Sequence, residues 1–563
     1  MRKLIRPIRA RLLARDKNKT RDKNKTSQLN SAVQQNPVEK PADSSLLGSD
    51  LASNLARIKE RFQNCSDIVY REFLFAQRED IKIVLIYTDG LADEGQVSEQ
   101  IMRALALELP MAAPQHEITQ AGAYHMIMER GLCTHQIKET SSLEDVVEAV
   151  LSGDTVLLVG GHARAIINSA RKWEHRQVAE SEIEMVVRGP REAFVENLRT
   201  NTSMLRRKIK NPDLKIETMK LGQVTRTDVC LVYIKGIVND KLVDEVKRRL
   251  QDIEIDSVMS SGYLEDMIQD NPWSPFPQVN YTEKPDRLAA RLLEGRVGIM
   301  VDGTPIVLTV PTVFMEFLHS AEDYYERSQI GTAVRIIRFF SMFMSLIMPS
   351  LYVAIITFHH EMLPTGLLLS LAAQREAVPF PVFVEALAME LTFEILREAG
   401  IRLPRQVGQA VSIVGALILG EAGVRAGLVA PATVIVVSFT GITSFVYFYS
   451  ASFTVRLLRF PMLVLSAAFG LYGLIIVLIL IVVHMCTLRS FGVPYLAPIA
   501  PLVPEDLKDT IVRAPWWGMF ARPRSIAWKR SQRVTPGQKP APPAKGSEQK
   551  GGEGGAGKGQ NQH

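Results

Sequence analysis

The sequence has few cysteines, and they are widely scattered. Its 563 residues include four, far apart and without the Cys-x-x-Cys spacing of zinc and redox sites: Cys65, Cys133, Cys230 and Cys486. A zinc site and a dense disulfide framework are therefore not expected. The thiols are predicted to be reduced and to face the cytosol.

Motifs of common enzyme sites are also missing. The chain has no GxxxxGK(S/T) loop, no GxGxxG after an expected strand, and no HExxH or GxSxG. His359, His360 and Glu361 are adjacent, but neighbouring residues on a helix point in different directions, which disfavours a metal site. Asp302-Gly303 fits a turn better than an acid or phosphorylation site. We therefore expect no enzyme activity, no metal and no cofactor.

Both ends of the chain are polar. The basic start is not followed by a long apolar run, so a secretory signal peptide is not expected. The hexapeptide RDKNKT occurs twice in tandem, from Arg15 to Thr26. Residues 1–50 are predicted to be a disordered basic arm, because such a repeat has too little apolar area to offset the entropy of ordering. A membrane-surface role for this arm is the less favoured alternative.

The C-terminal tail, residues 499–563, is rich in proline and then in lysine, glycine and glutamine. It is predicted to be disordered from about residue 530. Trp516, Trp517 and Trp528 lie among basic residues, which suits interfacial anchors or the surface packing of a short tail equally well.

The net charge of +6 is modest, and much of the basic excess lies in the tails. Basic tails favour anionic partners, and membrane lipids are the nearest candidate. Nucleic acid is not expected as a partner, because no nucleic-acid-binding motif occurs.

Residues 51–330 have the pattern of soluble α/β structure, expected as two subdomains, 51–187 and 188–330. In the first, apolar runs predict strands at Ile81–Tyr87 and Thr155–Gly161, with a helix at Val97–Leu109 between them.

The second subdomain is predicted to contain a hairpin. Strands are expected at Val229–Gly236 and within Val297–Val310, where Asp302-Gly303 supplies a tight turn because glycine accepts a positive φ. A charged helix at Lys241–Gln251 lies between these strands in the sequence.

Long apolar runs are concentrated between residues 331 and 498. Four of them are long enough for a membrane span of about 20 residues: Val334–His359, Val407–Ala430, Ala432–Ser450 and Pro461–Cys486. Four such runs in succession are hard to explain as buried helices of a soluble protein. Residues 331–498 are therefore predicted to be an α-helical membrane domain with four to five spans.

One charged segment interrupts the apolar runs. A helix is expected from about Val382 to Ala399, after prolines that suit a helix start. At 100° per residue, four charged side chains fall on an arc about 100° wide while Glu385 lies opposite: Glu390, Glu394, Arg397 and Glu398. The favoured interpretation is an amphipathic helix at the membrane interface or on the soluble domain. The alternative is a helix that faces an aqueous path through the membrane.

A charge pair lies inside an expected span. Glu421 and Arg425 are four residues apart and can neutralise each other as an intramembrane charge pair on one helix face. Unpaired, each would cost about 2.5–3.5 kcal/mol on insertion scales.

The distribution of arginines only partly decides the topology. Arg335 and Arg338 are placed at the start of the first expected span, which puts the soluble region in the cytoplasm. Four crossings return the basic tail to the cytoplasm but leave Arg456 and Arg459 in an outer loop. A fifth crossing repairs that loop but puts the tail outside. Both termini in the cytoplasm is the favoured arrangement.

Long blocks of the chain closely resemble A-type subunits of the GerA spore germination family. They include VVRGPREAFVENLRTN (Val186–Asn201), SPFPQVNYTEKPDRLAARLLEGRVGIMVDGTP (Ser274–Pro305) and LRSFGVPYLAP (Leu488–Pro498), together with the charged segment described above. The resembling blocks extend over residues 67–498. The repeat arm lies outside them.

The resemblance implies a function as the membrane subunit of a nutrient-sensing germination receptor in the inner spore membrane. It implies a homo-oligomer that forms a nutrient-gated ion path, with a transporter-like B subunit that binds the nutrient and a lipoprotein C subunit. The alternatives are a non-conducting scaffold subunit and a related spore protein that acts downstream in ion release. If the path exists, the expected lining residues are Val378, Pro379, Pro381, Val382, Glu385 and Met389.

Overall fold

The computed structural model describes residues 46–112, 119–128, 137–172, 184–404, 415, 418–447, 449–526, 531–535 and 537–540. Most of the expected basic arm, Cys133 and Trp528 lie outside these residues. The chain divides into two compact units. The first contains residues 46–60, 70–87 and 93–171, and the second contains 61–69, 88–92 and everything described from 172 onward. The expected domain boundaries near residues 50, 187, 330 and 498 stay predictions.

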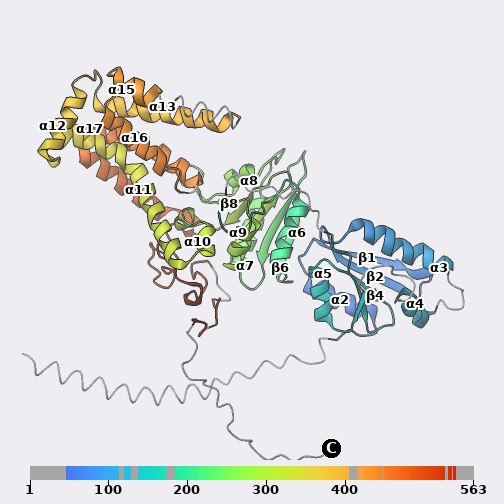
Figure 1. Cartoon of the computed structure of the whole chain (residues 1–563). Coiled ribbons are helices and arrows are strands. Elements are labelled where there is room, and N and C mark those ends of the chain that lie inside the picture. Colours follow the sequence, from blue (N-terminus) through green and yellow to red (C-terminus); the bar gives the residue numbers. More distant parts are fainter. Residues whose placement is uncertain are drawn as a thin grey trace, which may run out of the picture. The chain divides into compact units, whose positions relative to one another are not determined.

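The first unit is built on a five-stranded sheet of order β1-β2-β4-β5-β3. Strands β1, β2 and β4 are labelled in Figure 1. Its strands are β1 (Ile68–Leu74), β2 (Lys82–Thr88), β3 (Ile137–Thr140), β4 (Thr155–Val159) and β5 (Ala165–Asn168). Its helices are α2 (Leu51–Arg61), η1 (Phe75–Gln77), η2 (Gln96–Met102), η3 (Ala104–Glu108), α3 (Leu109–Ala112), α4 (Gln120–Met126) and α5 (Leu143–Leu151). Both predicted strands and the predicted helix are confirmed, although much of the helix is π-helical.

The second unit begins with another five-stranded sheet, of order β6-β7-β9-β10-β8. Its strands are β6 (Leu214–Leu221), β7 (Thr227–Ile234), β8 (Asn280–Thr282), β9 (Val297–Val301) and β10 (Val307–Val310), and each neighbouring pair is antiparallel. The predicted hairpin is confirmed, because β9 pairs with β10 and Gly303 has a φ of +85° between them. We call residues 184–325 the second sheet domain.

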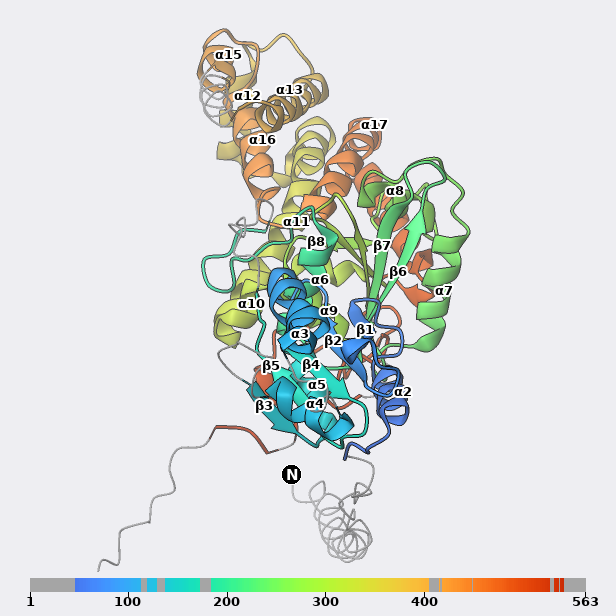
Figure 2. The same ribbon diagram turned by 90° about the vertical axis from the view of Figure 1, so that its right-hand side faces the viewer.

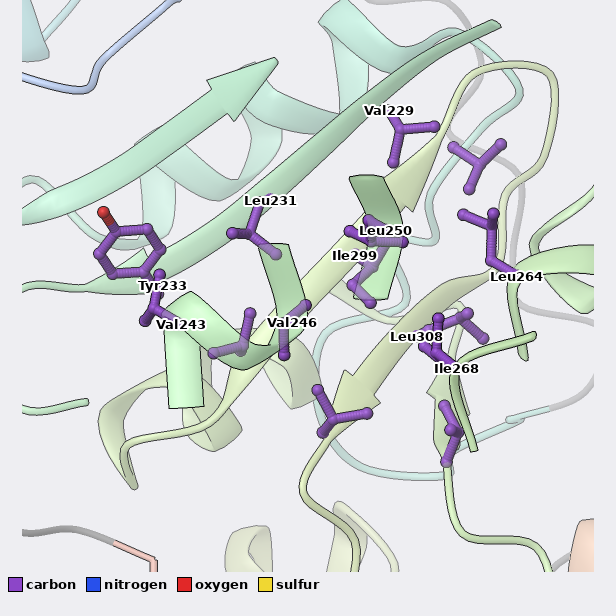
Figure 3. Packing of buried hydrophobic residues seen from close by; sticks show 14 of the residues in the cluster. Val229, Leu231, Tyr233, Val243, Val246, Leu250, Leu264, Ile268, Ile299 and Leu308 are labelled. Atoms are coloured by element: carbon purple, nitrogen blue, oxygen red, sulfur yellow. The ribbon is translucent and has the colours of Figure 1, made fainter. Parts of the chain in front are cut away.

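Helices cover both faces of this sheet, which explains why its central strands are continuously apolar. Along β7, Val229, Leu231 and Tyr233 point to one face and pack against α7 (Asp240–Gln251) and α8 (Ser261–Ile268), as Figure 3 shows. The alternate residues Cys230, Val232 and Ile234 point to the other face. There they pack against α6 (Leu198–Lys208) and α9 (Pro285–Leu293).

The second unit continues into a helical region, residues 328–487. It follows η5 (Phe314–Leu318) and α10 (Glu322–Tyr325). Its helices are α11 (Ser328–Phe358), η6 (His360–Met362), α12 (Thr365–Arg375), α13 (Val382–Arg402), η7 (Ile418–Ala422), α15 (Gly423–Arg425), α16 (Pro431–Thr443) and α17 (Tyr449–Thr487). Figures 1 and 2 both show α11 beside α17. The chain then forms a two-stranded ribbon of β11 (Arg489–Ser490) and β12 (Val493–Pro494), followed by η8 (Trp516–Gly518).

Helix α17 reverses direction at Gly470, where φ is +62° and ψ is −141°. A Cβ placed on Gly473 would lie 2.1 Å from the carbonyl oxygen of Leu465, a contact that a continuous helix does not allow. The two ends also meet the same loop, because Thr454 donates to Pro275 O at 2.6 Å and His484 lies 2.9 Å from Ser274. In a straight helix Thr454 and His484 would be about 45 Å apart. Residues 449–469 and 471–487 are therefore two arms that lie side by side.

Two helical segments among the described residues are long and apolar enough to cross a membrane, Ser328–Phe358 and, if the two arms of α17 are counted together, Ala451–Thr487. The first matches the expected span at Val334–His359. The expected span at Pro461–Cys486 contains the reversal at Gly470, so it is not one continuous segment. The apolar helix α16 has 13 residues, which is short for a full span. Much of Val407–Ala430 lies outside the described residues. The expected four to five spans therefore stay a prediction.

Candidate functional site

Helix α13 carries the charged side chains that the sequence singles out. It runs over Val382–Arg402, three residues further than predicted. Pro381 caps its start in an extended conformation, and the helix ends just before Leu403-Pro404, as expected because a residue that precedes proline avoids the helical region.

Glu390 forms a buried ion pair with an arginine of α17. Its Oε2 accepts a hydrogen bond from Arg459 Nη1 at 2.5 Å, and both side chains are 1% exposed. Within the described residues, Glu390 Oε1 and Arg459 Nε and Nη2 have no hydrogen-bond partner. The ion pair neutralises both charges, but these three buried polar atoms make no hydrogen bond among the described residues. Unsatisfied polar atoms in an apolar setting lower the stability of the folded chain.

Glu394 lies one turn further along α13 and pairs with two arginines. Arg456 of α17 reaches its Oε2 at 3.0 Å, and Arg397 of α13 reaches its Oε1 at 3.4 Å. Arg397 also donates to Ser444 Oγ at 2.6 Å and lies over the rings of Phe393 and Phe445. These contacts hold α13 against the link between α16 and α17.

Glu385, which the helical wheel places apart from the other charges, also has partners. It is 1% exposed and accepts a hydrogen bond from Arg375 Nη1 of α12 at 2.9 Å. The backbone N–H of Ala430, next to α16, donates to its other oxygen. We call the contacts of Glu385, Glu390 and Glu394 with Arg375, Arg459, Arg456 and Arg397 the ion-pair ladder.

The spacing of the ladder follows from helix geometry. Glu390 and Glu394 are one turn apart on α13, while Arg456 and Arg459 are three residues apart on α17. These separations correspond to about 6 Å and about 4.5 Å along a helix axis, so two opposed pairs can form at once. The pairing order, 390 with 459 and 394 with 456, shows that α13 and the first arm of α17 are antiparallel.

The structure separates the expected pore-lining residues into two groups. Val382, Glu385 and Met389 are buried within the chain, and Val382 belongs to an apolar cluster with Val353 of α11 and Leu463 of α17. Val378 is half-buried, whereas Pro379 and Pro381 are exposed. A pore lined by these residues stays a prediction.

The expected charge pair of Glu421 and Arg425 forms, but it lies on the outside of the chain. Arg425 Nη2 contacts Glu421, and their side chains are 52% and 78% exposed, Glu421 being the less exposed of the two. Its position inside a membrane is not tested. By contrast, the Glu390–Arg459 pair of the ladder is buried.

Three members of the ladder are missed by reasoning from the sequence, namely Arg375, Arg456 and Arg459. The expectation that Arg456 and Arg459 lie in an outer loop is wrong, because both are inside α17 and buried. The sequence does contain a sign of these pairs. Arg456 and Arg459 are three residues apart beside an apolar run, so on a helix they lie on one face and can pair with Glu390 and Glu394, which are four apart.

Arg335 and Arg338 also differ from the expectation that they flank a span. Both lie inside α11 and are buried, and both donate to the carboxylate of Asp323, which follows the second sheet domain's last strand. Arg335 additionally contacts Asp509 Oδ1 of the C-terminal tail at 2.7 Å. These arginines hold the start of α11 against Asp323 and Asp509. Because this structural role accounts for their positions, they give little information on the orientation of the chain in a membrane.

The tail packs beside this fastening point. Trp516 Nε1 donates to the carbonyl of Tyr324 at 3.3 Å, and Arg533 lies over the Trp516 ring. Of the two interpretations of the tail tryptophans, surface packing therefore fits Trp516 better than a lipid anchor.

Comparison with known proteins finds a family model and several relatives that match this chain. The family model described as Bacillus/Clostridium GerA spore germination protein matches residues 56–525. Spore germination protein KA of Bacillus subtilis (strain 168) is 44% identical over 511 residues, 91% of this chain and 92% of that protein. Spore germination protein GerLA of Bacillus cereus is 37% identical over 486 residues, 86% of this chain and 97% of that protein.

One solved structure is also similar. The crystal structure of the N-terminal domain of the A subunit of the Bacillus megaterium spore germinant receptor GerK3 is 37% identical. The match covers 48% of this chain and 98% of that chain, with a TM-score of 0.39.

Proposed function

The chain belongs to the Bacillus/Clostridium GerA spore germination protein family, and from this we propose that it is a receptor subunit that conducts ions when a nutrient binds. In this proposal several copies form an oligomer in the inner spore membrane. A transporter-like B subunit binds the nutrient, and a lipoprotein C subunit completes the receptor.

The observation that carries the proposal is the ion-pair ladder inside an apolar helical region. Charges at membrane depth are costly, and when present they commonly mark ion paths or switches. The rungs join α13 to two neighbours, α12 at Glu385 and α17 at Glu390 and Glu394. A shift of α13 along α17 would change which carboxylate faces which arginine. The ladder therefore suits a helix with two stable positions, which gating requires.

The division of the expected lining residues suggests where the path runs. Val378, Pro379 and Pro381 are accessible on the link between α12 and α13, so neighbouring copies could place them around a shared axis. Val382, Glu385 and Met389 support that link from inside the chain. A ring of apolar side chains can close a path by excluding water, while nearby carboxylates favour cations.

The test uses Val378→Ala and Val382→Ala in spores. Val378→Ala removes apolar bulk from the proposed constriction, and Val382→Ala removes packing that supports it. Both changes are expected to make germination leaky or spontaneous, measured as ion release without nutrient. Val384→Ala is the matched control, because Val384 lies on the same helix but is 42% exposed. If both variants keep dormancy and respond normally to nutrient, the pore assignment fails.

A scaffold function is the second candidate. All three ladder carboxylates have partners within the chain, which equally suits a rigid frame for other subunits. Ion flux through reconstituted protein, with and without the B and C subunits, separates the two. A scaffold gives no nutrient-dependent flux in either case. The downstream ion-release alternative predicts that B and C subunits do not co-purify with the chain.

A further inference from the structure

A cavity lies where the helical region meets the second sheet domain. Its volume is about 440 Å³. The walls come from α11, α13, α17, the link between α16 and α17, the start of α9, and residues 184–186 and 317–321 of the second sheet domain. We call it the basal cavity. The ladder pair of Arg397 and Arg456 forms part of its lining, but Glu394, which pairs with both, does not.

The lining is strongly cationic. Five of its side chains carry a positive charge and one carries a negative charge, Glu184. The cationic side chains are Lys284, Arg287, Arg338, Arg397 and Arg456. Asp323 and Glu394 stand behind Arg338, Arg397 and Arg456, and even with these two carboxylates the cations are in excess.

Some of these donors are not used by the chain. Arg397 is 7% exposed in its side chain, and its Nε is buried without a partner in the part of the chain that the structure describes. The hydrogen bonds described for Arg338 all leave from Nη1, to Leu318 O and the Asp323 carboxylate. Cationic donors at a cavity wall favour a ligand that accepts hydrogen bonds and carries negative charge.

The positive charge around the cavity also affects the pKa of a histidine in its lining. His319 lines the cavity, and the pKa of His319 lies well below its usual value. Burial is the larger cause, and repulsion from Arg335, Arg338 and Arg287 adds to it. The imidazole is therefore neutral at physiological pH beside several permanent cations.

The rim of the cavity is apolar where the helical region forms it. Phe445 and Val446 both line it and remain 69% and 38% exposed. The cations inside the cavity would bind an anionic headgroup, and the exposed apolar side chains at the rim would contact hydrophobic chains attached to it.

We propose that the basal cavity binds a phosphate group, supplied by the headgroup of an anionic phospholipid or by a free phosphate. Planar guanidinium groups suit phosphate oxygens because they donate two parallel hydrogen bonds. The apolar rim favours the lipid source. That source rests on the membrane setting of the proposed function, whereas binding of free phosphate does not.

The experiment uses the full chain purified in mild detergent. Native mass spectrometry measures the binding of phosphatidylglycerol, with phosphatidylcholine as the neutral lipid and inorganic phosphate as competitor and as sole ligand. Lys284→Gln and Arg397→Gln each remove one cavity charge. Each is expected to weaken phosphatidylglycerol binding about tenfold, the size of one lost charge-assisted hydrogen bond.

Two variants guard against misfolding. Arg402→Gln is the matched control, because Arg402 lies on α13 outside the cavity lining and pairs with Glu398 at the surface. It should bind lipid like the parent chain. Arg397→Lys keeps the positive charge and should retain most of the binding, while thermal unfolding confirms that each variant is folded.

Each outcome decides the proposal. Preference for phosphatidylglycerol, weakened by the two cavity variants, supports a lipid phosphate. Binding of inorganic phosphate that depends on the same residues, without preference between the lipids, supports a free phosphate. Equal binding of both lipids without phosphate binding would overturn the proposal. So would Lys284→Gln and Arg397→Gln variants that are folded and bind as tightly as Arg402→Gln.

Discussion

Glu390 Oε2 lies 2.5 Å from Arg459 Nη1, and each of the two side chains is 1% exposed. The residues are 69 positions apart in sequence and join α13 to the first arm of α17. The contact neutralises two charges in an apolar region. It does so through a single hydrogen bond that leaves other polar atoms of both groups without partners in the described residues. This pair therefore offers the most direct test of the ion-pair ladder.

Glu390→Gln is expected to lower the free energy of unfolding by about 3–5 kcal/mol, because it leaves Arg459 as a buried charge without a counterion. Denaturation of the purified chain in detergent measures the loss. The double variant Glu390→Gln/Arg459→Met should recover much of it, since both charges are then absent.

Glu421→Gln is the matched control for that experiment. Glu421 and Arg425 form an ion pair of the same chemistry, but both side chains are largely exposed. The expected loss is below about 1 kcal/mol, as for most surface pairs. Equal losses at Glu390 and Glu421 would show that burial of the first pair has no energetic consequence.

Gly470→Ala is expected to destabilise the two-arm arrangement of α17. Gly470 has a φ of +62°, and an added Cβ would lie 2.7 Å from His359 Cε1 and 3.0 Å from Phe358 Cβ. The strained backbone conformation alone costs about 1–3 kcal/mol. A lower thermal unfolding midpoint is the expected readout.

The control for the reversal is Gly366→Ala in α12, where an added Cβ meets nothing within 4 Å. This change should leave the midpoint unchanged or raise it slightly, because alanine is the better helix former. A Gly470→Ala chain as stable as the Gly366→Ala chain would contradict the reversal at Gly470.

Asp323→Asn is expected to loosen the start of α11. The Asp323 carboxylate accepts hydrogen bonds from Arg335 and Arg338, and the amide removes the charge that balances them. The expected loss is about 1.5–3 kcal/mol, typical of a hydrogen bond to a charged group. Hydrogen exchange at the N-terminal turns of α11 should accelerate. Unchanged exchange there would show that the arginines do not depend on Asp323.

Stability is expected to depend on pH through Glu265 of α8. Burial, with a smaller contribution from Asp266, raises the pKa of Glu265 to about 7 from an ordinary value of 4.5. The folded chain therefore keeps a proton that the unfolded chain has lost between about pH 4.5 and about pH 7. Since the folded state binds more protons in that window, the free energy of unfolding decreases as pH rises through it.

Glu265→Gln should remove this contribution, so the variant loses less stability than the parent chain between pH 5 and pH 7. Asp266→Asn is the comparison, because it removes only the smaller contribution to the pKa of Glu265 and should leave most of the pH dependence in place. Thermal unfolding at several pH values measures both. Parallel pH profiles of the parent and the Glu265→Gln chain would rule out this role.

The local structure of this protein follows from patterns between nearby residues. The apolar run of β7, the turn at Asp302-Gly303 and the start of α13 after Pro381 all follow from rules that connect residues a few positions apart. The chain's motifs also led to its family, because long blocks of sequence are specific. The sequence also predicts that Glu390, Glu394, Arg397 and Glu398 share one side of α13, because the helical period fixes the angle between residues.

Which charges meet, and where the chain reverses, depends instead on how distant helices pack against one another. Glu390 finds Arg459 because α13 and α17 pack in one particular register, and no short-range pattern encodes a contact between residues 69 positions apart. The sequence does not predict the reversal at Gly470, because the residues before and after it are mostly apolar. Hydrophobicity favours burial of such a run without specifying its direction, so the turn depends on the contacts that surround it.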